Sequence, residues 1–300
     1  MKQYTIYQID AFTKEKFKGN PAGVVVNADG LSENDMRRIA RELNNSETAF
    51  LFRPDDNNCD GIIRYFTPTV EVPTCGHATI AAMYAKAIEE EIGSCVLQFK
   101  TKIGVLPFEI DNSGDNIKIW MAQGKIEIEP PLSKDIQRDL FEYLGIPPED
   151  IDKRCPVQIA STGHSKVMIG IASREKLNGL DPNLYQLKEL SKTINCKGYF
   201  VFTLNSNDPE VFSYGRMFAP AIGINEDPVT GNANGPLGAY LVHNKVVDVP
   251  LDTFTFKGAQ GEAIGRDGVV EVIVSIKNKK PSLVKIGGEA ITIFKTFIEL

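Results

Sequence analysis

The feature of this sequence that most constrains its fold is an internal repeat. Residues 64–68 read Arg-Tyr-Phe-Thr-Pro, and a short loop leads from them to Cys-Gly-His-Ala at 75–78 and a helix rich in small residues. Residues 216–220 read Arg-Met-Phe-Ala-Pro, and a loop three residues longer leads to Thr-Gly-Asn-Ala at 230–233 and a second such helix. Each copy predicts a strand, a proline turn, a loop, a glycine and a helix in the same order, which indicates two related halves.

The length and composition favour a globular protein of two domains. The chain has 300 residues, 42% of them hydrophobic and 24% charged, and its net charge is −6. An acidic chain without clustered Lys and Arg is a poor partner for nucleic acid. Its longest weakly polar stretch, residues 78–85, is far shorter than the roughly 20 apolar residues of a membrane span. With no signal-peptide pattern at the N-terminus, we expect a cytoplasmic protein without a membrane partner.

The pattern of strands and helices predicts an α+β fold. Met36, Ile39, Ala40 and Leu43 have the spacing of an amphipathic helix, for which Ser32 is a suitable N-cap. Further helices are expected from Gly76 to about residue 91 and at 133–144 and 183–194, and residues 123–131 are the best linker candidate. The chain from residue 253 onward reads as almost all short strands. Consecutive strands outnumber helices, which disfavours a regular βαβ alternation. The other predicted strands are 4–12, 22–26, 47–52, 61–67, 96–99, 105–110, 117–121, 157–161, 166–171, 198–204 and 212–218.

Several classes of reactive site are absent from the sequence pattern. The five cysteines are scattered and form no CxxC pair, and no HxxxH or HExxH spacing occurs, so neither a disulfide framework nor a metal site is expected. No glycine-rich nucleotide-binding motif is present either, and we expect no cofactor. Carboxylates, one informative histidine, one cysteine and backbone amides remain. Such a set suits proton transfer next to a carbonyl or carboxylate group.

The two glycine-containing helix starts are candidate anion sites. Helix N-termini expose unpaired N–H groups with partial positive charge, and glycine lets a ligand approach the backbone closely. If the starts at Gly76 and Gly231 face one cleft, they would hold a small carboxylate or a developing enolate from both sides. Both helices are rich in small residues, which predicts central helices wrapped closely by sheet.

A set of motifs that runs nearly from end to end resembles the phenazine-biosynthesis (PhzF-like) isomerase family. The motifs occur in the order that the family shows. They are Gly-Asn-Pro-Ala-Gly-Val at 19–24, Ser-Glu-Thr-Ala-Phe at 46–50, Phe-Thr-Pro at 66–68 with Cys-Gly-His-Ala-Thr at 75–79, Glu-Asp-Pro-Val-Thr-Gly at 226–231, and the later Gln-Gly at 260–261, Gly-Arg at 265–266 and Gly-Gly at 287–288.

The resemblance implies a diaminopimelate-epimerase-like fold of two pseudo-repeated domains, each with a curved mixed sheet wrapped around a central helix. The N-terminal domain would span residues 1–120 together with a terminal strand at about 289–300, and the C-terminal domain would span 121–288. The resemblance also implies a homodimer, and isomerisation without metal or organic cofactor. The expected partner is a small carboxylate-bearing metabolite similar to trans-2,3-dihydro-3-hydroxyanthranilate.

The family pattern also assigns roles to individual residues. Glu47 lies where the family has its proton-moving glutamate, and the match puts His77 and Asp227 beside the substrate as assisting groups. Gly76 and Gly231 would supply backbone amides, and Asn232 stands at a substrate-binding position where serine is common. Without the family, Glu47 reads as a solvated residue at a strand start, Asp227 as a turn residue and His77 as a helix cap.

Two alternatives to this assignment remain open. Cys75 precedes Gly76 as in the related two-thiol epimerases and racemases, but Thr230 stands where the second thiol would be. A single-thiol amino-acid epimerase, racemase or dehydratase that uses Cys75 therefore stays conceivable. The other alternative is a protein that keeps the fold for binding alone, without catalysis.

Overall fold

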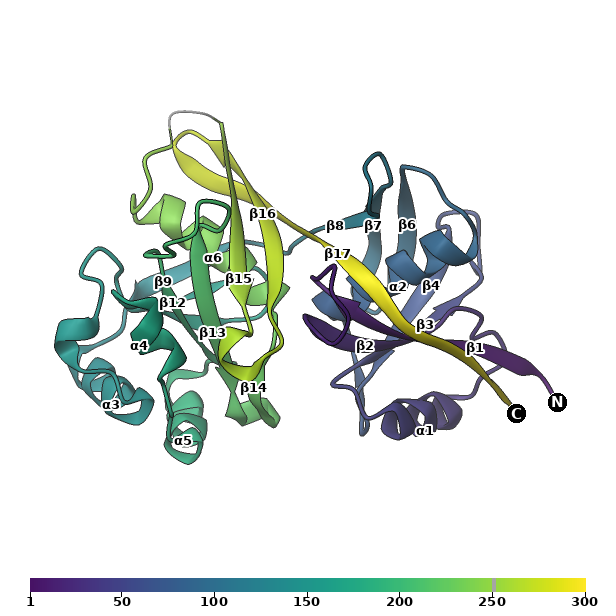
Figure 1. The fold of residues 1–300 in the computed structure, drawn as a ribbon, viewed down its shortest axis with the longest axis horizontal. Helices are drawn as coiled ribbons and strands as arrows, with labels where there is room; N and C mark the ends of the chain where they lie inside the picture. The colour runs from purple at the N-terminus through teal and green to yellow at the C-terminus, as the bar shows by residue number, and fades with distance from the viewer. Residues whose placement is uncertain (250–251) are drawn as a thin grey trace. The chain divides into compact units, whose positions relative to one another are not determined.

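The structure is a computed structural model that describes residues 1–249 and 252–300. The chain divides into two compact units, which are considered separately below (Figure 1). The N-terminal unit comprises Met1–Ala122 and Gly287–Leu300, and the C-terminal unit comprises Gln123–Ile286. Within the described part of the chain, no helix has the length and apolar character needed to cross a membrane.

The N-terminal unit is a mixed sheet with two helices. Strand β1 pairs antiparallel with both β2 and β17, so the two ends of the chain lie side by side (Figure 1). Parallel pairs join β2 to β3 and β4 to β6, and antiparallel pairs join β3 to β4, β4 to β5, β6 to β7 and β7 to β8. The elements are β1 (Gln3–Ala11), β2 (Asn20–Val25), α1 (Glu33–Leu43), β3 (Thr48–Phe52), β4 (Gly61–Phe66), β5 (Glu71–Val72), α2 (Gly76–Glu89), β6 (Cys95–Thr101), β7 (Gly104–Asp111), β8 (Lys118–Ala122) and the later part of β17 (Lys280–Glu299).

Helix α1 begins where the sequence pattern predicts. Ser32 is its N-cap: the hydroxyl accepts a hydrogen bond from the Asp35 amide, and the Asp35 carboxylate accepts one from the Ser32 amide, which completes a capping box. The apolar face buries Met36 and Ile39 in a core cluster beneath the sheet. The predicted helix and its cap are confirmed.

Helix α2 is the central helix of the N-terminal unit. Every residue from 77 to 83 is buried, which covers nearly two full turns on all sides. The helix packs against β1, β2, β3, β7 and β8. Alanines at 78, 81, 82 and 85 allow strands to approach this closely, as the small-residue pattern predicts.

The C-terminal unit is also a mixed sheet around a central helix, and it carries additional helices (Figure 1). Antiparallel pairs join β9 to β10, β10 to β11, β12 to β13, β13 to β14 and β15 to β16, while β11–β12 and β13–β15 are parallel. The elements are β9 (Glu127–Pro131), α3 (Lys134–Leu144), η1 (Pro148–Asp150), β10 (Gln158–Ser161), β11 (Lys166–Gly170), α4 (Arg174–Asn178), α5 (Leu184–Ile194), β12 (Tyr199–Thr203), β13 (Ser213–Ala219), η2 (Pro220–Ile222), β14 (Ile224–Asp227), α6 (Gly231–His243), β15 (Thr253–Gln260), η3 (Glu262–Ile264), β16 (Gly268–Lys277) and the start of β17.

Helix α6 is the counterpart of α2 in the C-terminal unit. All residues from 233 to 242 are buried, although Pro236 and two glycines make the segment a poor helix former. Tertiary packing therefore holds it in place, against β10, β15 and β16. At Gly238 a Cβ atom would lie 2.7 Å from Cγ2 of Val274 and 3.0 Å from the Phe256 ring, so only glycine allows this approach.

The sheet of the C-terminal unit has two differently covered faces. Val167 and Ile169 of β11 belong to a core cluster that also contains Leu140 of α3 and Leu187 of α5. On the other face, the Phe202 ring packs edge-on against Tyr240 of α6, with 6.0 Å between ring centroids. Helices α3 and α5 thus share one face, and α6 covers the other.

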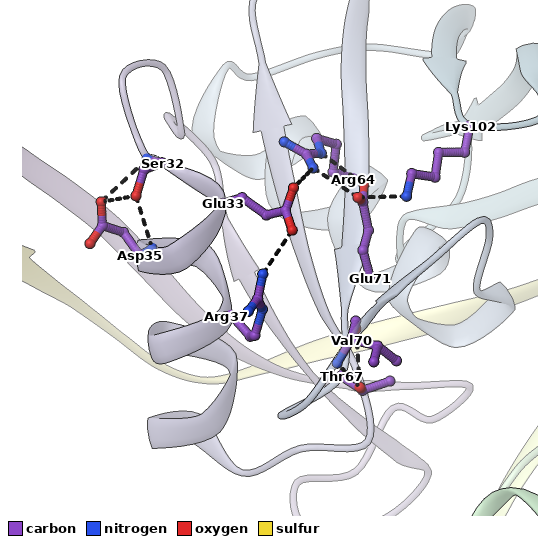
Figure 2. A network of polar contacts seen from close by, with 9 residues as sticks. All are labelled: Ser32, Glu33, Asp35, Arg37, Arg64, Thr67, Val70, Glu71 and Lys102. Carbon is purple, nitrogen blue, oxygen red and sulfur yellow. Dashed lines mark hydrogen bonds and ion pairs between the residues drawn. The ribbon is translucent and has the colours of Figure 1, made fainter.

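The internal repeat extends to matching ion pairs in the two units. Arg64 of β4 forms a two-pronged pair with Glu71 of β5, with both N–O distances 2.8 Å (Figure 2). Arg216 of β13 forms the same pair with Glu226 of β14, at 2.9 and 2.7 Å. Each guanidinium also lies over the ring of the phenylalanine two residues later, at 5.1 and 5.0 Å. Each pair ties the returning strand β5 or β14 to the strand before it, ahead of the central helix.

The two pairs are expected to differ in their effect on stability. Arg216→Gln should lower the free energy of unfolding by about 3–5 kcal/mol, because it leaves Glu226 buried without its partner. The Arg216 and Glu226 side chains are only 8% and 13% exposed. Arg64→Gln is the matched control: Arg64 is 30% exposed, and Glu71 keeps Lys102 at 2.7 Å. Urea unfolding of both variants measures the difference, and equal losses would contradict this account.

The expected linker at residues 123–131 is wrong in its second half. Residues Glu127–Pro131 form strand β9, which pairs with β10 through Ile128 opposite Ala160. The strand is mostly exposed, and proline is tolerated in such a strand wherever the ladder does not need its missing N–H. The Glu-Pro-Pro composition therefore suggested a linker, although the backbone of these residues is extended and pairs with β10.

The end of the chain consists of strands, as expected, but they are not short. Strands β15, β16 and β17 have 8, 10 and 20 residues. The division between the units falls within β17, between Ile286 and Gly287. A strand can continue past such a boundary because each part pairs with its own neighbours, which the sequence pattern does not reveal.

Candidate active site

Three of the candidate residues in the N-terminal unit meet at the start of α2. Glu47 directly precedes β3, which the parallel pairing of Thr48 with Gly23 of β2 holds in register. Cys75 is the N-cap of α2, and His77 is the second residue of the helix. The structure therefore brings together two segments that are about 30 residues apart in the sequence.

The His77 ring lies between an acid and a thiol. Its Nε2 atom is 3.4 Å from Oε2 of Glu47 and 3.2 Å from the hydroxyl oxygen of Ser46. Its Nδ1 atom is 3.5 Å from Sγ of Cys75. The Glu47 side chain is 16% exposed and that of His77 is 9% exposed, so water screens the pair only weakly. An imidazole in this position can orient the carboxylate or exchange a proton with it.

Two buried hydroxyl groups hold the start of α2 in place through hydrogen bonds. The Thr79 hydroxyl donates a hydrogen bond of 2.6 Å to the carbonyl of Cys75, and it contacts the Tyr65 hydroxyl at 2.6 Å. Burial raises the pKa of Tyr65 far above its usual value, so this phenol stays neutral. The Cys75 side chain accepts no hydrogen bond from the helix it precedes, and Gly76 begins that helix. The N-cap side chain thus leaves the first amides of α2 uncapped, which suits an anion site.

The same group of side chains could also accommodate a metal ion. One ligand atom from each of Glu47, Cys75 and His77 lies within 4.8 Å of the other two. The members of this group follow no local metal-binding motif, so the sequence pattern does not reveal it. Oxygen, sulfur and nitrogen ligands together favour zinc over magnesium or calcium.

The remaining candidates lie in the C-terminal unit, around the start of α6. Asp227 ends β14, and the Thr230 hydroxyl donates a hydrogen bond to its carboxylate. Thr230 is the N-cap, Gly231 is the first helical residue, and Asn232 departs from helical geometry with φ −81° and ψ 19°. This start also lacks a side-chain cap from its N-cap residue. Asp227, Gly231 and Asn232 thus form a second cluster within their own unit.

Gln260 holds this second cluster in place, a role that sequence reasoning missed. Its Oε1 atom accepts a hydrogen bond of 3.1 Å from the Thr230 amide, and its Nε2 atom donates one of 2.7 Å to the Asp227 carbonyl. The side chain is only 2% exposed. Gly261 follows with φ +90°, where a Cβ atom would lie 2.2 Å from the carbonyl oxygen of Arg266. The Gln-Gly motif was visible in the sequence, but its contacts are 30 residues away.

Comparison with known proteins identifies the family of the chain. The model of the phenazine biosynthesis-like proteins, PhzC-PhzF, matches residues 9–296. A protein of Clostridium acetobutylicum that is named an uncharacterized isomerase is 54% identical over 300 residues, which cover 100% of this chain and 99% of the relative. The trans-2,3-dihydro-3-hydroxyanthranilate isomerase of Pseudomonas chlororaphis is 31% identical and is covered, like this chain, over 97% of its length.

Solved structures with similar coordinates identify the fold of the chain. A PhzF-family protein of Bacillus anthracis is 31% identical and superimposes with a TM-score of 0.88 over 100% of both chains. A hydroxyproline epimerase of Agrobacterium vitis is 12% identical, with a TM-score of 0.63 over 99% of this chain and 93% of that one, and shows the fold alone. The predicted α+β fold, shared with such epimerases, is confirmed. The chain belongs to the phenazine biosynthesis-like (PhzC-PhzF) family.

Proposed function

We propose that this protein is an isomerase that moves a proton within a small carboxylate-bearing substrate by general acid/base catalysis, without a metal or organic cofactor. The observation that carries the proposal is the Glu47 carboxylate, held 3.4 Å from His77 at the uncapped start of α2. The relative from Pseudomonas chlororaphis acts on trans-2,3-dihydro-3-hydroxyanthranilate, according to its name. A similar cyclic, unsaturated carboxylate is the proposed substrate class.

Glu47 is the proposed proton carrier. Its carboxylate takes a proton from one substrate carbon, and the electron pair of the broken C–H bond enters the adjacent unsaturated system. The resulting carboxylic acid then gives the proton to a different carbon, so nothing is oxidised or reduced. His77 orients the carboxylate through Nε2. Asp227 is the proposed assisting carboxylate.

The helix starts are the proposed binding groups for the substrate's carboxylate. Backbone amides at Gly76 and Gly231 are suited to this role because neither helix has a side-chain cap from its N-cap residue. The Asn232 side chain offers a further donor where serine is common in the family. One well-aimed donor can contribute about 2.7–4 kcal/mol to the stability of a transition state.

The direct test is to incubate the purified protein with trans-2,3-dihydro-3-hydroxyanthranilate and follow the compound by proton NMR. The proposal expects an isomerised product with the same mass. A folded protein that leaves the compound unchanged would contradict this substrate class. A binding protein without catalysis would retain the compound and never convert it.

A single-thiol epimerase or dehydratase is the second candidate, and the 3.5 Å contact between Cys75 Sγ and His77 Nδ1 favours it. Such an enzyme would use a thiolate paired with imidazolium as its base.

Cys75→Ser separates the two candidates. We expect the variant to keep turnover of trans-2,3-dihydro-3-hydroxyanthranilate within about tenfold, because general acid/base work by Glu47 needs no thiol. Steady-state rates of wild type and variant are compared at equal folded concentration. A loss beyond about 10³-fold would favour thiol chemistry over Glu47.

A further inference from the structure

Lys166 is a buried lysine of the C-terminal unit that the proposed reaction does not use. It is the first residue of β11 and is only 4% exposed. Lysine is almost never buried to this degree unless its ammonium group is paired. The partners of the ammonium group therefore indicate whether Lys166 stabilises the fold or binds a ligand.

The partners of the ammonium group are few. Its Nζ atom carries three donors, and among the described residues it makes one hydrogen bond, to the carbonyl of His164 at the long distance of 3.4 Å. The titratable groups around it are Asp227, Cys196 and Lys197. Burial lowers the pKa of Lys166 to about 8, and electrostatic interactions with Cys196 and then Asp227 oppose part of that shift.

Lys166 points to the face of the sheet that α6 covers. Side chains alternate along a strand, and Val167 belongs to the core cluster shared with α3 and α5. Lys166 and Met168 therefore occupy the opposite face. That face is the one on which Phe202 meets Tyr240 of α6.

Asp227 lies on the same face of the same sheet. The register aligns Met168 with Phe200, Phe200 with Met217, and Met217 with Asp227. Paired residues on neighbouring strands project to the same side. Lys166 stands two residues before Met168, and α6 begins four residues after Asp227. The buried ammonium and the candidate substrate-binding residues thus share one face.

We propose that Lys166 is a further substrate-binding residue, whose ammonium group binds an anionic oxygen of the substrate beside the start of α6. A buried ammonium with one weak partner costs the fold free energy, and an anionic ligand that enters this site would offset the cost. The proposal rests on the proposed function only for the identity of the ligand. Any small carboxylate would provide the chemistry, and inorganic phosphate is the alternative anion to exclude.

Stability gives the first test, independent of activity. Lys166→Met keeps an unbranched side chain of nearly the same length and removes the charge, so we expect a higher Tm than wild type at pH 7. Because the pKa is lower in the folded than in the unfolded protein, the cost of the charge is fully present below pH 8. It is relieved as the pH rises from about 8 towards 10.5, and the advantage of the variant should shrink over that range. A variant less stable than wild type at pH 7 would assign Lys166 to the fold and overturn the proposal.

Ligand binding gives the second test, with anthranilate as a cyclic carboxylate and inorganic phosphate as the other anion. Calorimetry should show Lys166→Met binding anthranilate about 10- to 100-fold more weakly than wild type, as expected for loss of a charged hydrogen bond. Lys197→Met, at an exposed neighbour, is the matched control and should bind like wild type. The proposal is overturned if wild type and Lys166→Met bind anthranilate equally well. It is also overturned if neither protein binds anthranilate. Phosphate bound more tightly than anthranilate, and lost in Lys166→Met, would reassign the site and also overturn it.

Turnover separates this inference from the proposed function. With trans-2,3-dihydro-3-hydroxyanthranilate, Lys166→Met should raise KM about tenfold or more and change kcat much less, because it removes binding rather than proton transfer. Wild type that binds anthranilate through Lys166 but converts nothing would contradict the proposed function and leave the binding role standing. Normal turnover with an unchanged KM in Lys166→Met would contradict the binding role of Lys166 and leave the proposed function standing.

Discussion

Replacement of Glu47 by Gln is expected to lower kcat by about 10²–10⁴-fold, the range typical of a lost general acid/base. The amide keeps the shape of the side chain and can still contact His77, but it cannot accept and return a proton. Because glutamine has the same shape as glutamate and leaves no cavity beside His77, the Tm should stay close to that of wild type. Steady-state kinetics with trans-2,3-dihydro-3-hydroxyanthranilate and a thermal melt of the same sample measure both effects.

Glu71→Gln is the matched control for this variant. Glu71 is a carboxylate of the same unit whose pKa is lowered by its hydrogen bonds with Arg64 and Lys102. We expect this variant to lose stability at neutral pH and to keep kcat. The stabilising effect of the Glu71 carboxylate is present above its ordinary pKa and disappears as the pH falls, so the stability gap to wild type should close in acid. An equal loss of kcat in Glu71→Gln and Glu47→Gln would contradict the role of Glu47 as the proton carrier.

Replacement of Gln260 by Leu is expected to lower both stability and substrate affinity. The change leaves the Thr230 amide and the Asp227 carbonyl without their buried partner, at a cost of about 1–3 kcal/mol for each group. Gln260 acts through these two residues and is therefore a positioning residue. Below the lowered melting temperature, the loosened segment should raise KM, which a purely structural role would leave unchanged. Urea unfolding and kinetics at low temperature measure the two effects.

Gln158→Leu provides the matched control in the same unit. Gln158 is also 2% exposed, but its Nε2 atom has no hydrogen-bond partner among the described residues. Removing this unsatisfied buried donor should be nearly neutral for stability and for KM. Gln260→Glu keeps an acceptor for the Thr230 amide and should restore part of the loss. If Gln158→Leu and Gln260→Leu behave alike, burial alone explains the effect and the positioning role is wrong.

Much of the fold could be predicted from local sequence patterns. Helix α1 follows from its apolar spacing and from Ser32 and Asp35, which interact within one turn. The repeat around Arg64 and Arg216 indicated two similar halves, because each copy encodes a strand, a turn and the start of a central helix. Local chemistry determines these features, so reading the chain in order is enough to find them.

The contacts around the candidate sites could not be predicted in the same way. Gln260 reaches back 30 residues to Thr230, and Lys166 shares a face with Asp227 only through the register of four strands. Strand β9 was missed because two prolines hid its pairing with β10. Each of these features depends on pairing between distant segments, which neither composition nor periodicity encodes.

The most direct test of the central claim is one NMR time course in D₂O, run with wild type, Glu47→Gln and Cys75→Ser on trans-2,3-dihydro-3-hydroxyanthranilate. The claim predicts isomerised product with wild type and with Cys75→Ser, and almost none with folded Glu47→Gln. Product formed by Glu47→Gln at nearly the wild-type rate would contradict it.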